Sequence, residues 1–393
     1  MIFRALTFSL VTIFSVQMWA QEKKTSAVEN IIVTPEPKKE VVELIKKSEF
    51  TGDFRYRYQQ ITNGSTKERR RNQLMFRVGQ NIQLQDDLKF TYRLMTGAEA
   101  GSGNVTLGGT ATPATSGNQG SPRQFIGLDL AYGTYNPAKD VSIFFGKNAQ
   151  YFYFASKNQI ILDRDITPEG VGVQYKTGLF DDTLMATVNL GGFWVAEKYS
   201  ATDELNDTFL SVAQLNLMYK FSDFQIIAGY GMFNYSDVKG ELPTSFSNLS
   251  TTSNARGNTL VGGRYLNNYE IKQASLEVKW NMKPFEVSIF GEADENTAAD
   301  TLGRASLLGT SFVWDRISLT YMYQRVEKDA VFAIYTDGDF AGGVTSSEGS
   351  IISAGYKLSK NAIVSYTTYQ NRYGIDVAST DYARSNVDLT LSF

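Results

Sequence analysis

The last eleven residues of the chain alternate strictly between apolar and polar side chains. Val387, Leu389, Leu391 and Phe393 fall on one face of an extended strand, and the residues between them fall on the other. A period of two is typical of a strand with an apolar medium on one side and water on the other. The free edge of such a strand needs a partner, so we expect it to pair with the first strand and close a barrel. An ordinary last strand of a soluble β-domain has the same pattern.

Composition favours strands over membrane-spanning helices. The 393 residues include 22 Tyr, 25 Phe and 33 Gly but only 8 Pro, and the mean hydropathy is −0.24. After the N-terminus, no stretch approaches the ~18 apolar residues that a transmembrane helix needs. Abundant aromatic residues suit strands and the girdles of membrane barrels.

The absence of cysteine and histidine excludes many kinds of chemistry. No disulfide, thiolate metal site or cysteine nucleophile is available, and the usual general base and commonest metal ligand are missing. We therefore expect no enzymatic activity, no cofactor and no metal. The near balance of 38 basic and 41 acidic residues also argues against a nucleic-acid-binding protein.

The N-terminal segment reads as an export signal. Arg4 precedes an apolar run that ends near Ala20, which predicts a signal peptide over residues 1–20. Residues 21–48 are charged and lack aromatic side chains, so we expect a periplasmic lead-in, with at most a short helix. The predicted barrel domain occupies residues 49–393.

Alternating segments of about 10–14 residues fill the predicted barrel domain, a length that suits tilted membrane strands. The short connections between them are 85–87, 136–140, 180–182, 222–223, 281–284, 315–316 and 359–361. The long connections are 62–69, 101–122, 153–165, 200–209, 237–267, 294–301, 331–346 and 374–382. Seven turns and eight loops predict an all-β, transmembrane antiparallel β-barrel of about 16 strands, with short periplasmic turns and long extracellular loops. A barrel of this size is expected to enclose a water-filled lumen.

The charged face of each strand is expected to line the lumen. A charge facing lipid at mid-membrane costs about 2–4 kcal/mol, which places the charged side chains inside. The predicted pore-lining residues of these strands are Arg55, Arg57, Arg77, Arg93, Arg123 and Asp129. Water and passing anions would screen such an arginine wall. The alternative is ordinary solvation, with the arginines paired to Asp53 or Asp129.

The third long connection is a second candidate for the lumen lining. It carries Asp163, Arg164 and Asp165, and Glu169 follows it. If this loop folds inward, its carboxylates could face the arginines, and opposed rows of charge would create a transverse field that favours polar solutes. The alternative is a surface loop.

Two other segments have simpler interpretations. The aromatic run at 151–154 is expected to belong to an interfacial girdle rather than to a sugar-stacking surface. The acidic segments 294–296 and 337–339 lack the full spacing of a calcium loop and are expected to be surface acidity.

Several sequence blocks resemble a bacterial putative-porin family. The matching blocks are 50–58, 69–79, 92–97, 127–132 and 161–175. In addition, the C-terminal strand with Val387, Leu389, Leu391 and Phe393 resembles the assembly signal of bacterial outer-membrane barrels. The family resemblance implies a passive porin in outer-membrane lipid, with small hydrophilic solutes or ions as cargo. It further implies contact with the barrel-assembly machinery and, as in classical porins, a homotrimer.

Two functions follow from these observations. The first is a diffusion channel for small hydrophilic solutes, favouring anions through the arginine wall. The second is a surface-display or adhesion barrel that binds partners through long loops such as 101–122 and 237–267. These loops are rich in Gly, Ser, Thr and Asn, which suits flexible exposed segments more than dedicated interfaces.

Overall fold

The computed structural model describes residues 47–97, 102–108, 124–199, 206–246 and 255–393. The predicted signal peptide, nearly all of the lead-in, and Arg123 lie outside the described residues. Within the described ranges, no helix is both long and apolar enough to cross a membrane.

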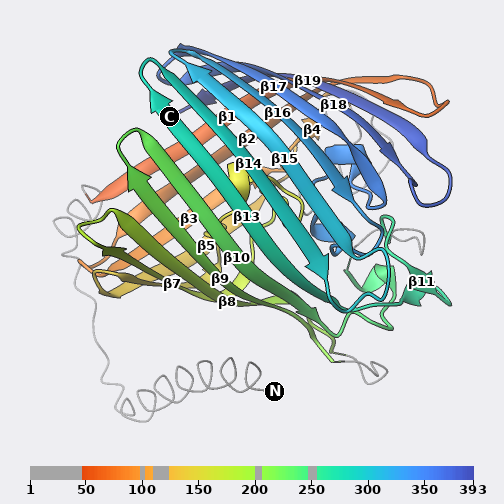
Figure 1. Ribbon diagram of the computed structural model, residues 1–393, viewed down its shortest axis with the longest axis horizontal. Helices are drawn as coiled ribbons and strands as arrows, with labels where there is room; N and C mark the ends of the chain where they lie inside the picture. Colours follow the sequence, from red (N-terminus) through yellow and green to blue (C-terminus); the bar gives the residue numbers. More distant parts are fainter. Residues whose placement is uncertain (1–46, 98–101, 109–123, 200–205, 247–254) are drawn as a thin grey trace, which may run out of the picture. The chain divides into compact units, whose positions relative to one another are not determined.

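The main sheet is a closed barrel of antiparallel strands (Figure 1). Of its 17 strands, β4 (Val105–Thr106) is a two-residue addition at one end, and the other sixteen form the wall. The wall strands are β1 (Ser48–Asn63), β2 (Arg69–Gln83), β3 (Leu88–Thr96), β5 (Ile126–Ala138), β6 (Val141–Lys147), β7 (Glu169–Leu179), β8 (Leu184–Ala196), β9 (Thr208–Phe221), β10 (Phe224–Ser236), β13 (Tyr269–Met282), β14 (Phe285–Asn296), β15 (Arg304–Trp314), β16 (Ile317–Val326), β17 (Ser347–Ser359), β18 (Ala362–Tyr373) and β19 (Thr380–Ser392). The expected fold class and strand number are confirmed.

The short and long connections alternate as the sequence predicts, which gives the barrel a turn end and a loop end. A separate hairpin of β11 (Leu260–Val261) and β12 (Arg264–Tyr265) lies within the fifth long loop. The strands span 7 to 16 residues, a wider range than expected. β6 is the shortest because the chain leaves the wall at Asn148, which is fully buried, to begin the third loop.

The last strand closes the barrel onto the first. β19 pairs with β1 over their length, and Gly52 and Phe393 exchange backbone hydrogen bonds of 2.9 and 3.0 Å. The Phe393 ring stacks on Phe50 at a centroid distance of 6.3 Å. A Cβ at Gly52 would lie 2.5 Å from that ring, so glycine permits the close approach.

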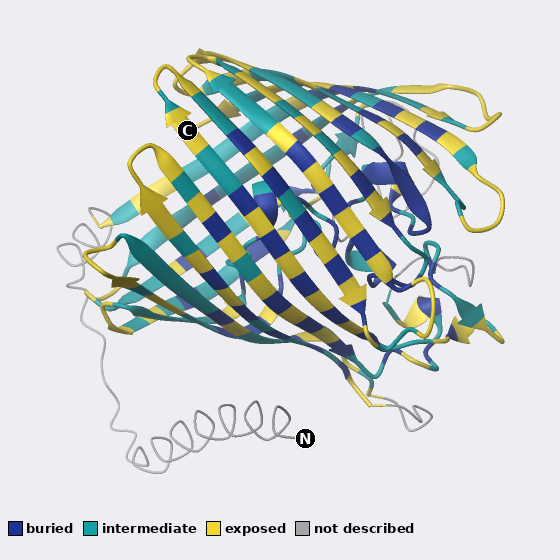
Figure 2. Ribbon diagram, in the orientation of Figure 1, coloured by how far each residue is buried: buried dark blue, intermediate teal, exposed yellow. Residues whose placement is uncertain are grey.

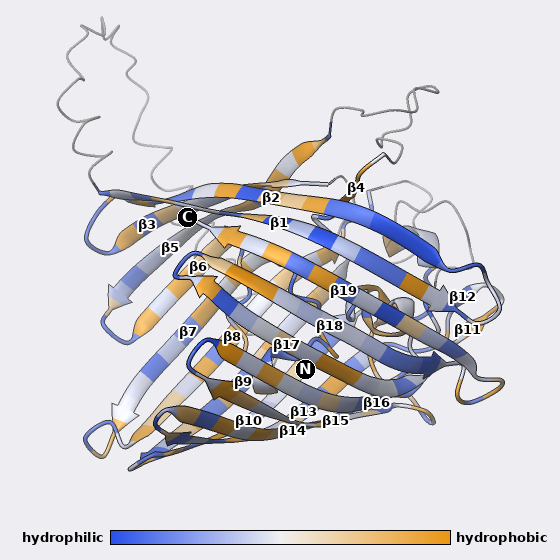
Figure 3. Ribbon diagram, turned by 90° about the horizontal axis from the view of Figure 1, so that it is seen from above, coloured by the Kyte–Doolittle hydropathy of each residue, from blue (hydrophilic) through white to orange (hydrophobic). Residues whose placement is uncertain are grey.

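The two faces of the wall follow the predicted alternation (Figure 2). On β19, Val387, Leu389 and Leu391 are exposed on the outside, whereas Asn386 and Asp388 are buried on the inside. The same alternation appears as hydropathy in Figure 3. An apolar exterior with a polar inner row is the arrangement of a membrane barrel.

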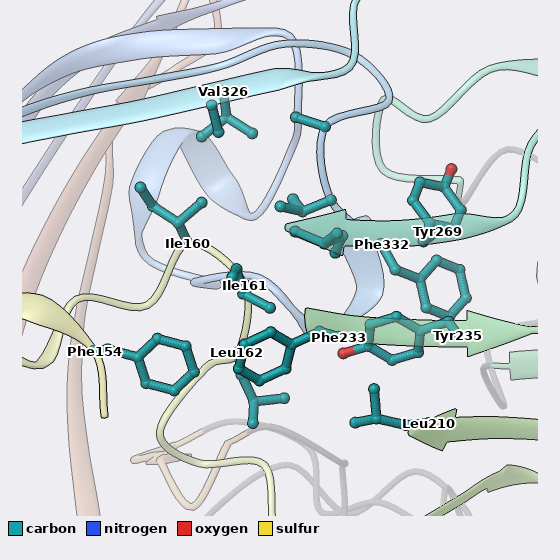
Figure 4. Close-up of a cluster of buried hydrophobic side chains, with 14 of the residues drawn as sticks. Phe154, Ile160, Ile161, Leu162, Leu210, Phe233, Tyr235, Tyr269, Val326 and Phe332 are labelled. Atoms are coloured by element: carbon teal, nitrogen blue, oxygen red, sulfur yellow. The ribbon is translucent and has the colours of Figure 1, made fainter. Parts of the chain in front are cut away.

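The interior differs from a uniformly water-filled lumen. The third loop (148–168) and the seventh loop (327–346) lie inside the barrel and pack against inward side chains of the wall. We call this packed region the plug (Figure 4); its buried residues include Phe154, Ile160, Ile161, Leu162, Phe193, Leu210, Phe233, Tyr235, Tyr269, Phe290 and Phe332. The plug covers the inner faces of β8 to β10 and β13 to β16, so open space is left mainly on the opposite side.

Candidate functional site

The open side of the interior is lined by arginines from three adjacent strands. From here on, the name arginine wall means the set that the structure shows, which differs from the predicted one: Arg55 and Arg57 of β1, Arg69, Arg71 and Arg77 of β2, and Arg384 of β19. Strand register arranges these residues in layers. Arg69 and Arg384 both lie opposite Ile61 at the loop end, Arg71 lies opposite Gln59 in the next layer, and Arg57 follows below. The wall is therefore a ladder that runs along the barrel axis.

Carboxylates hold part of this ladder in place. Arg57 donates two parallel hydrogen bonds to Asp388, from Nε at 2.7 Å and from a terminal nitrogen at 2.8 Å. Asp339 of the seventh loop lies 3.3 Å from Arg57 and 2.5 Å from Arg384, so it links β1 to β19. Bidentate pairing of this kind fixes both the position and the orientation of a guanidinium.

Three other arginines of the wall, Arg55, Arg69 and Arg71, have no carboxylate partner among the described residues. Arg55 donates to Asn104 at 2.8 Å, and the Nε of Arg71 donates to Gln59 at 2.5 Å. The Arg69 side chain forms no ion pair within the part of the chain that the structure describes. No carboxylate among the described residues forms an ion pair with these three guanidinium groups.

Carboxylates of two loops also line the open space. Asp163 and Asp165 of the third loop, with Asp337 and Asp339 of the seventh, form what we call the carboxylate ridge. The two loops bind each other directly: the amide of Asp163 donates to the Tyr335 carbonyl at 2.6 Å, and the Gly338 amide donates to the Asp163 carboxylate at 3.1 Å. The ridge is thus one surface built from two loops.

Burial changes the protonation of this ridge. Loss of hydration, together with the nearby charges of Asp339 and Asp163, raises the pKa of Asp337 to about 8. Burial and the charge of Asp165 likewise raise the pKa of Asp163 to about 6, against the effect of two backbone amides that bind its charged form. At neutral pH, Asp337 therefore retains its proton in most molecules, and the ridge carries fewer than four negative charges.

The wall and the ridge both line a cavity of about 870 Å³, and they meet where Asp339 binds Arg57 and Arg384. Its basic lining residues are Arg55, Arg57, Arg69, Arg71, Arg77, Lys157, Arg164, Arg256 and Arg384. Its acidic lining residues are Asp163, Asp165, Asp337 and Asp339. Nine cationic side chains against four carboxylates give the described lining an excess of at least five positive charges.

The structure brings most of the predicted site residues to this cavity. Its lining includes Arg55, Arg57, Arg77, Asp163, Arg164 and Asp165. Arg93 instead pairs with Asp129 outside the cavity, and Glu169 pairs with Lys147 at 2.6 Å. The alternative of direct pairing therefore holds for Arg93, and also for Arg77, which binds Asp53.

Sequence reasoning did not select Arg69, Arg71 or Arg384, although the same alternation carries the signal. Arg384 has the same parity as the inward residues Asn386 and Asp388, and the run 69–71 places two of its three arginines inside. By contrast, nothing local in the sequence brings Arg256 or the seventh loop to the lumen, because those contacts depend on the packing of distant loops.

Two sequence interpretations are wrong. The aromatic run 151–154 is not an interfacial girdle: Tyr151 stacks on Phe144 at 4.7 Å inside the barrel, and Phe154 stacks on Phe233. The acidic segments are not simply surface features either: Asp337 and Asp294 are only 6% and 3% exposed, although the Glu295 side chain remains exposed. Inward folding of the third and seventh loops buries the aromatic run and Asp337, whereas Asp294 lies on the inner face of β14, which extends to Asn296. The described residues contain no group of acidic side chains arranged to hold a metal.

Comparisons with known proteins agree with this architecture. The solved structure of Pseudomonas putida OprB superposes with a TM-score of 0.57 at 11% identity, over 90% of this chain and 96% of that one. OmpF of Salmonella typhi, solved with daunomycin, gives a TM-score of 0.50 at 14% identity, over 88% and 97% of the two chains. At these identities the similarity concerns the fold alone. No curated protein matches the sequence.

The family comparison extends from the fold to the kind of protein. The model of the family described as "Putative porin" matches residues 45–263, more than half of the chain. The match covers β1 to β10, and so includes most of the arginine wall and the third loop. The protein is thus a non-enzymatic β-barrel of the outer membrane, and the chain belongs to the putative-porin family.

Proposed function

We propose that this outer-membrane diffusion channel favours small anions over cations of similar size. The observation that carries the proposal is the excess of at least five positive charges among the described residues that line the cavity. Rings and rows of arginine at a narrow point attract anions and repel cations, because the local potential is not fully screened by salt.

The opposed rows of charge also explain how a polar solute would pass. The arginine wall and the carboxylate ridge line the same cavity, so their opposite charges create a field that orders water between them. A hydrophilic solute can exchange its hydration for these groups, whereas an apolar solute would have to displace ordered water without compensation. The channel is therefore proposed to admit small hydrophilic solutes.

The ion preference can be measured on the purified, full-length channel in planar bilayers. Under a potassium chloride gradient, the reversal potential of the native channel should correspond to preferred chloride permeation. Arg55→Glu should lower the chloride-to-potassium permeability ratio several-fold, because Arg55 lines the cavity without a carboxylate partner. Arg70→Glu is the matched control: it makes the same change of charge on β2, at a residue whose side chain is 64% exposed outside the barrel.

Two results would contradict the proposal. One is a native channel that prefers potassium or shows no preference. The other is a reversal potential that Arg55→Glu leaves unchanged, which would remove the arginine wall from the mechanism even if chloride were preferred.

We also propose that the outward row Val387, Leu389, Leu391 and Phe393 is read by the barrel-assembly machinery. These residues are exposed on the outside of the seam strand, where a partner could bind them before closure. Phe393→Ala should then lower the yield of folded barrel in cells more than Phe50→Ala does. Both variants lose the same ring contact, so equal yields would show that only the contact matters.

A further inference from the structure

We propose that the loop end of the arginine wall is a saturable binding site for phosphoryl groups, formed by Arg69 and Arg71 with Arg384 beside them. The inference deepens the proposed anion preference and rests on it. A general preference needs only an excess of positive charge, whereas a binding site needs guanidinium groups that lie together and that carboxylates do not fully neutralise.

The register places these three arginines together. Arg69 and Arg71 are two residues apart on the same face of β2, or about 6.6–6.8 Å along the strand. Arg69 and Arg384 flank Ile61 from the two neighbouring strands, which separates their backbones by about 9.4–9.8 Å. Arg71 interacts electrostatically with both of the others, and all three side chains line the same cavity.

Arg71 is held in position without being neutralised. Its Nε donates to Gln59, and Gln59 in turn donates to Asn386 at 3.0 Å. Gln59 and Asn386 are 0% and 1% exposed, so this pair of amides is a rigid support. Deeper in the wall, Arg57 is supported at the corresponding place by the Asp388 carboxylate instead. An amide orients a guanidinium but leaves its charge available to a ligand.

The charges that face this group do not compensate it. Arg69 and Arg71 have no carboxylate partner in the described part of the chain. Asp339 is the one carboxylate bound to the cluster there, and it is shared between Arg384 and Arg57. Like charges held this close repel one another, and an anion between them would relieve that repulsion.

A phosphoryl group fits this arrangement better than a halide or a single carboxylate. It carries about −1.5 to −2 charges near neutral pH and three strong acceptor oxygens. Planar guanidinium groups bind such oxygens in pairs. In its singly protonated form the group also has one hydroxyl, which can donate to the Asp339 carboxylate. Sulfate has a similar shape and charge but lacks this donor, so the two anions can be distinguished.

The same chemistry can come from free phosphate or from an organic phosphate. The cavity of about 870 Å³ is large enough to hold the remainder of a small phosphate monoester next to the bound group. Inorganic phosphate and glycerol 3-phosphate are therefore separate arms of the test, with sulfate as the third.

The test measures chloride current through the full-length channel in planar bilayers while each anion is added. Inorganic phosphate, glycerol phosphate or both should reduce the current in a saturable way, at lower concentration than sulfate does. The double variant Arg69→Gln, Arg71→Gln should raise the half-blocking phosphate concentration by roughly tenfold or more, which corresponds to the loss of one good charge-assisted contact. Arg70→Gln, on the same strand but outside, should behave as the native channel.

A second variant keeps both arginines and tests directly whether phosphate binding needs the unpaired positive charge of Arg71. Gln59→Glu would give Arg71 a carboxylate partner of the kind that Arg57 already has, and phosphate block should weaken. If the double variant does not assemble, this variant still decides the question. Unchanged block in Gln59→Glu or in the double variant would overturn the site.

The remaining outcomes separate this inference from the proposed function. If the channel prefers chloride but phosphate does not block it, or sulfate blocks it equally well, phosphoryl recognition fails and the anion preference stands. If the channel shows no preference for chloride and no block, both proposals fail.

Discussion

The two sides of the barrel interior have the same strand geometry but different surroundings: one side lines a polar cavity, and the other packs against the plug. Along β1, β2 and β19, the inward positions carry arginine, glutamine and aspartate, and they face a polar cavity. Along β8, β9, β10 and β13, inward positions near the loop end carry Phe193, Leu210, Phe233, Tyr235 and Tyr269, which are nearly or completely buried. One side is a lining in contact with solvent, and the other is packed like the core of a soluble protein.

This difference shows that an inward position does not by itself imply water. In a closed barrel, the alternation along each strand determines only which side chains face the interior. Whether they meet solvent depends on where the third and seventh loops lie, and these loops are bound to the aromatic side. The plug therefore narrows the lumen and holds the carboxylate ridge next to the arginine wall, which Asp339 contacts.

The largest expected effect comes from weakening the plug. Phe332 is fully buried in the seventh loop. Its ring centroid lies 5.3 Å from that of Tyr235 and 5.1 Å from that of Tyr269. Phe332→Ala should destabilise the docked loop by about 3–5 kcal/mol, the usual cost of removing a buried phenylalanine. Single-channel recordings should then show a higher and noisier conductance, because the constriction loses its support.

Phe180→Ala is the control for this change, since Phe180 is 78% exposed in a short turn at the other end of the barrel. Its conductance should match that of the native channel. If Phe332→Ala also left the conductance unchanged, the plug would not determine the width of the channel, and the contrast between the two sides would lose its functional meaning.

The next largest effect is expected in the arginine wall. Arg57→Ala would leave the buried carboxylate of Asp388 without its two hydrogen bonds. We expect a loss of about 2–3 kcal/mol in the free energy of unfolding, measured by denaturant titration in detergent. The double variant Arg57→Ala, Asp388→Ala should recover part of this loss. Additive losses would indicate that water already solvates this pair, as it does on an ordinary surface.

The sequence predicts the barrel well because closure depends on a strong local signal. Period-two alternation and turn residues locate the strands, and the residues of β19 identify the seam. The sequence also contains a signal for the packed side of the interior. On β13, Leu276 is exposed outside, but nearer the loop end the polarity inverts, so that Tyr269 and Ile271 are buried inside. An inversion of this kind within one strand indicates that its inner face meets apolar packing.

The candidate site is predicted only where a single strand carries it. Arg55, Arg57 and Arg77 follow directly from strand parity, and the third loop was a reasonable candidate for its length and charge. The contribution of Asp337 and Asp339 depends on contacts between loops about 175 residues apart in the chain. No local pattern encodes such a contact, because it is determined by how the plug as a whole fills the barrel.

A smaller effect on ion preference is expected when the pH changes, because the carboxylate ridge lies between the arginine wall and the plug. The pKa of Asp163 and that of Asp337 are raised to about 6 and about 8, so the folded loops hold protons that an unfolded chain would release. As the pH rises through these values, the ridge gains negative charge and the docked loops lose stability. The chloride-to-potassium permeability ratio should therefore fall across this range.

Asp337→Asn should remove the upper part of this pH response, because the amide stays neutral next to Asp339, Asp163 and Arg384. Reversal potentials measured below pH 6 and above pH 8 provide the comparison. A response that persists unchanged in Asp337→Asn would assign the titration to another group. A ratio that rises with pH would contradict the inferred sign.

The smallest effect is expected for a pair that remains in contact with water. Arg77 and Asp53 form an ion pair on the arginine wall, but their side chains are 25% and 18% exposed. Asp53→Asn should therefore change the free energy of unfolding by less than about 1 kcal/mol, as for other solvated pairs. It also releases the Arg77 charge into the lumen, so chloride preference should increase slightly. If Asp53→Asn lowered the free energy of unfolding as much as Arg57→Ala does, water would be excluded from this part of the wall as it is from the plug. The two sides would then differ in residue type but not in contact with solvent.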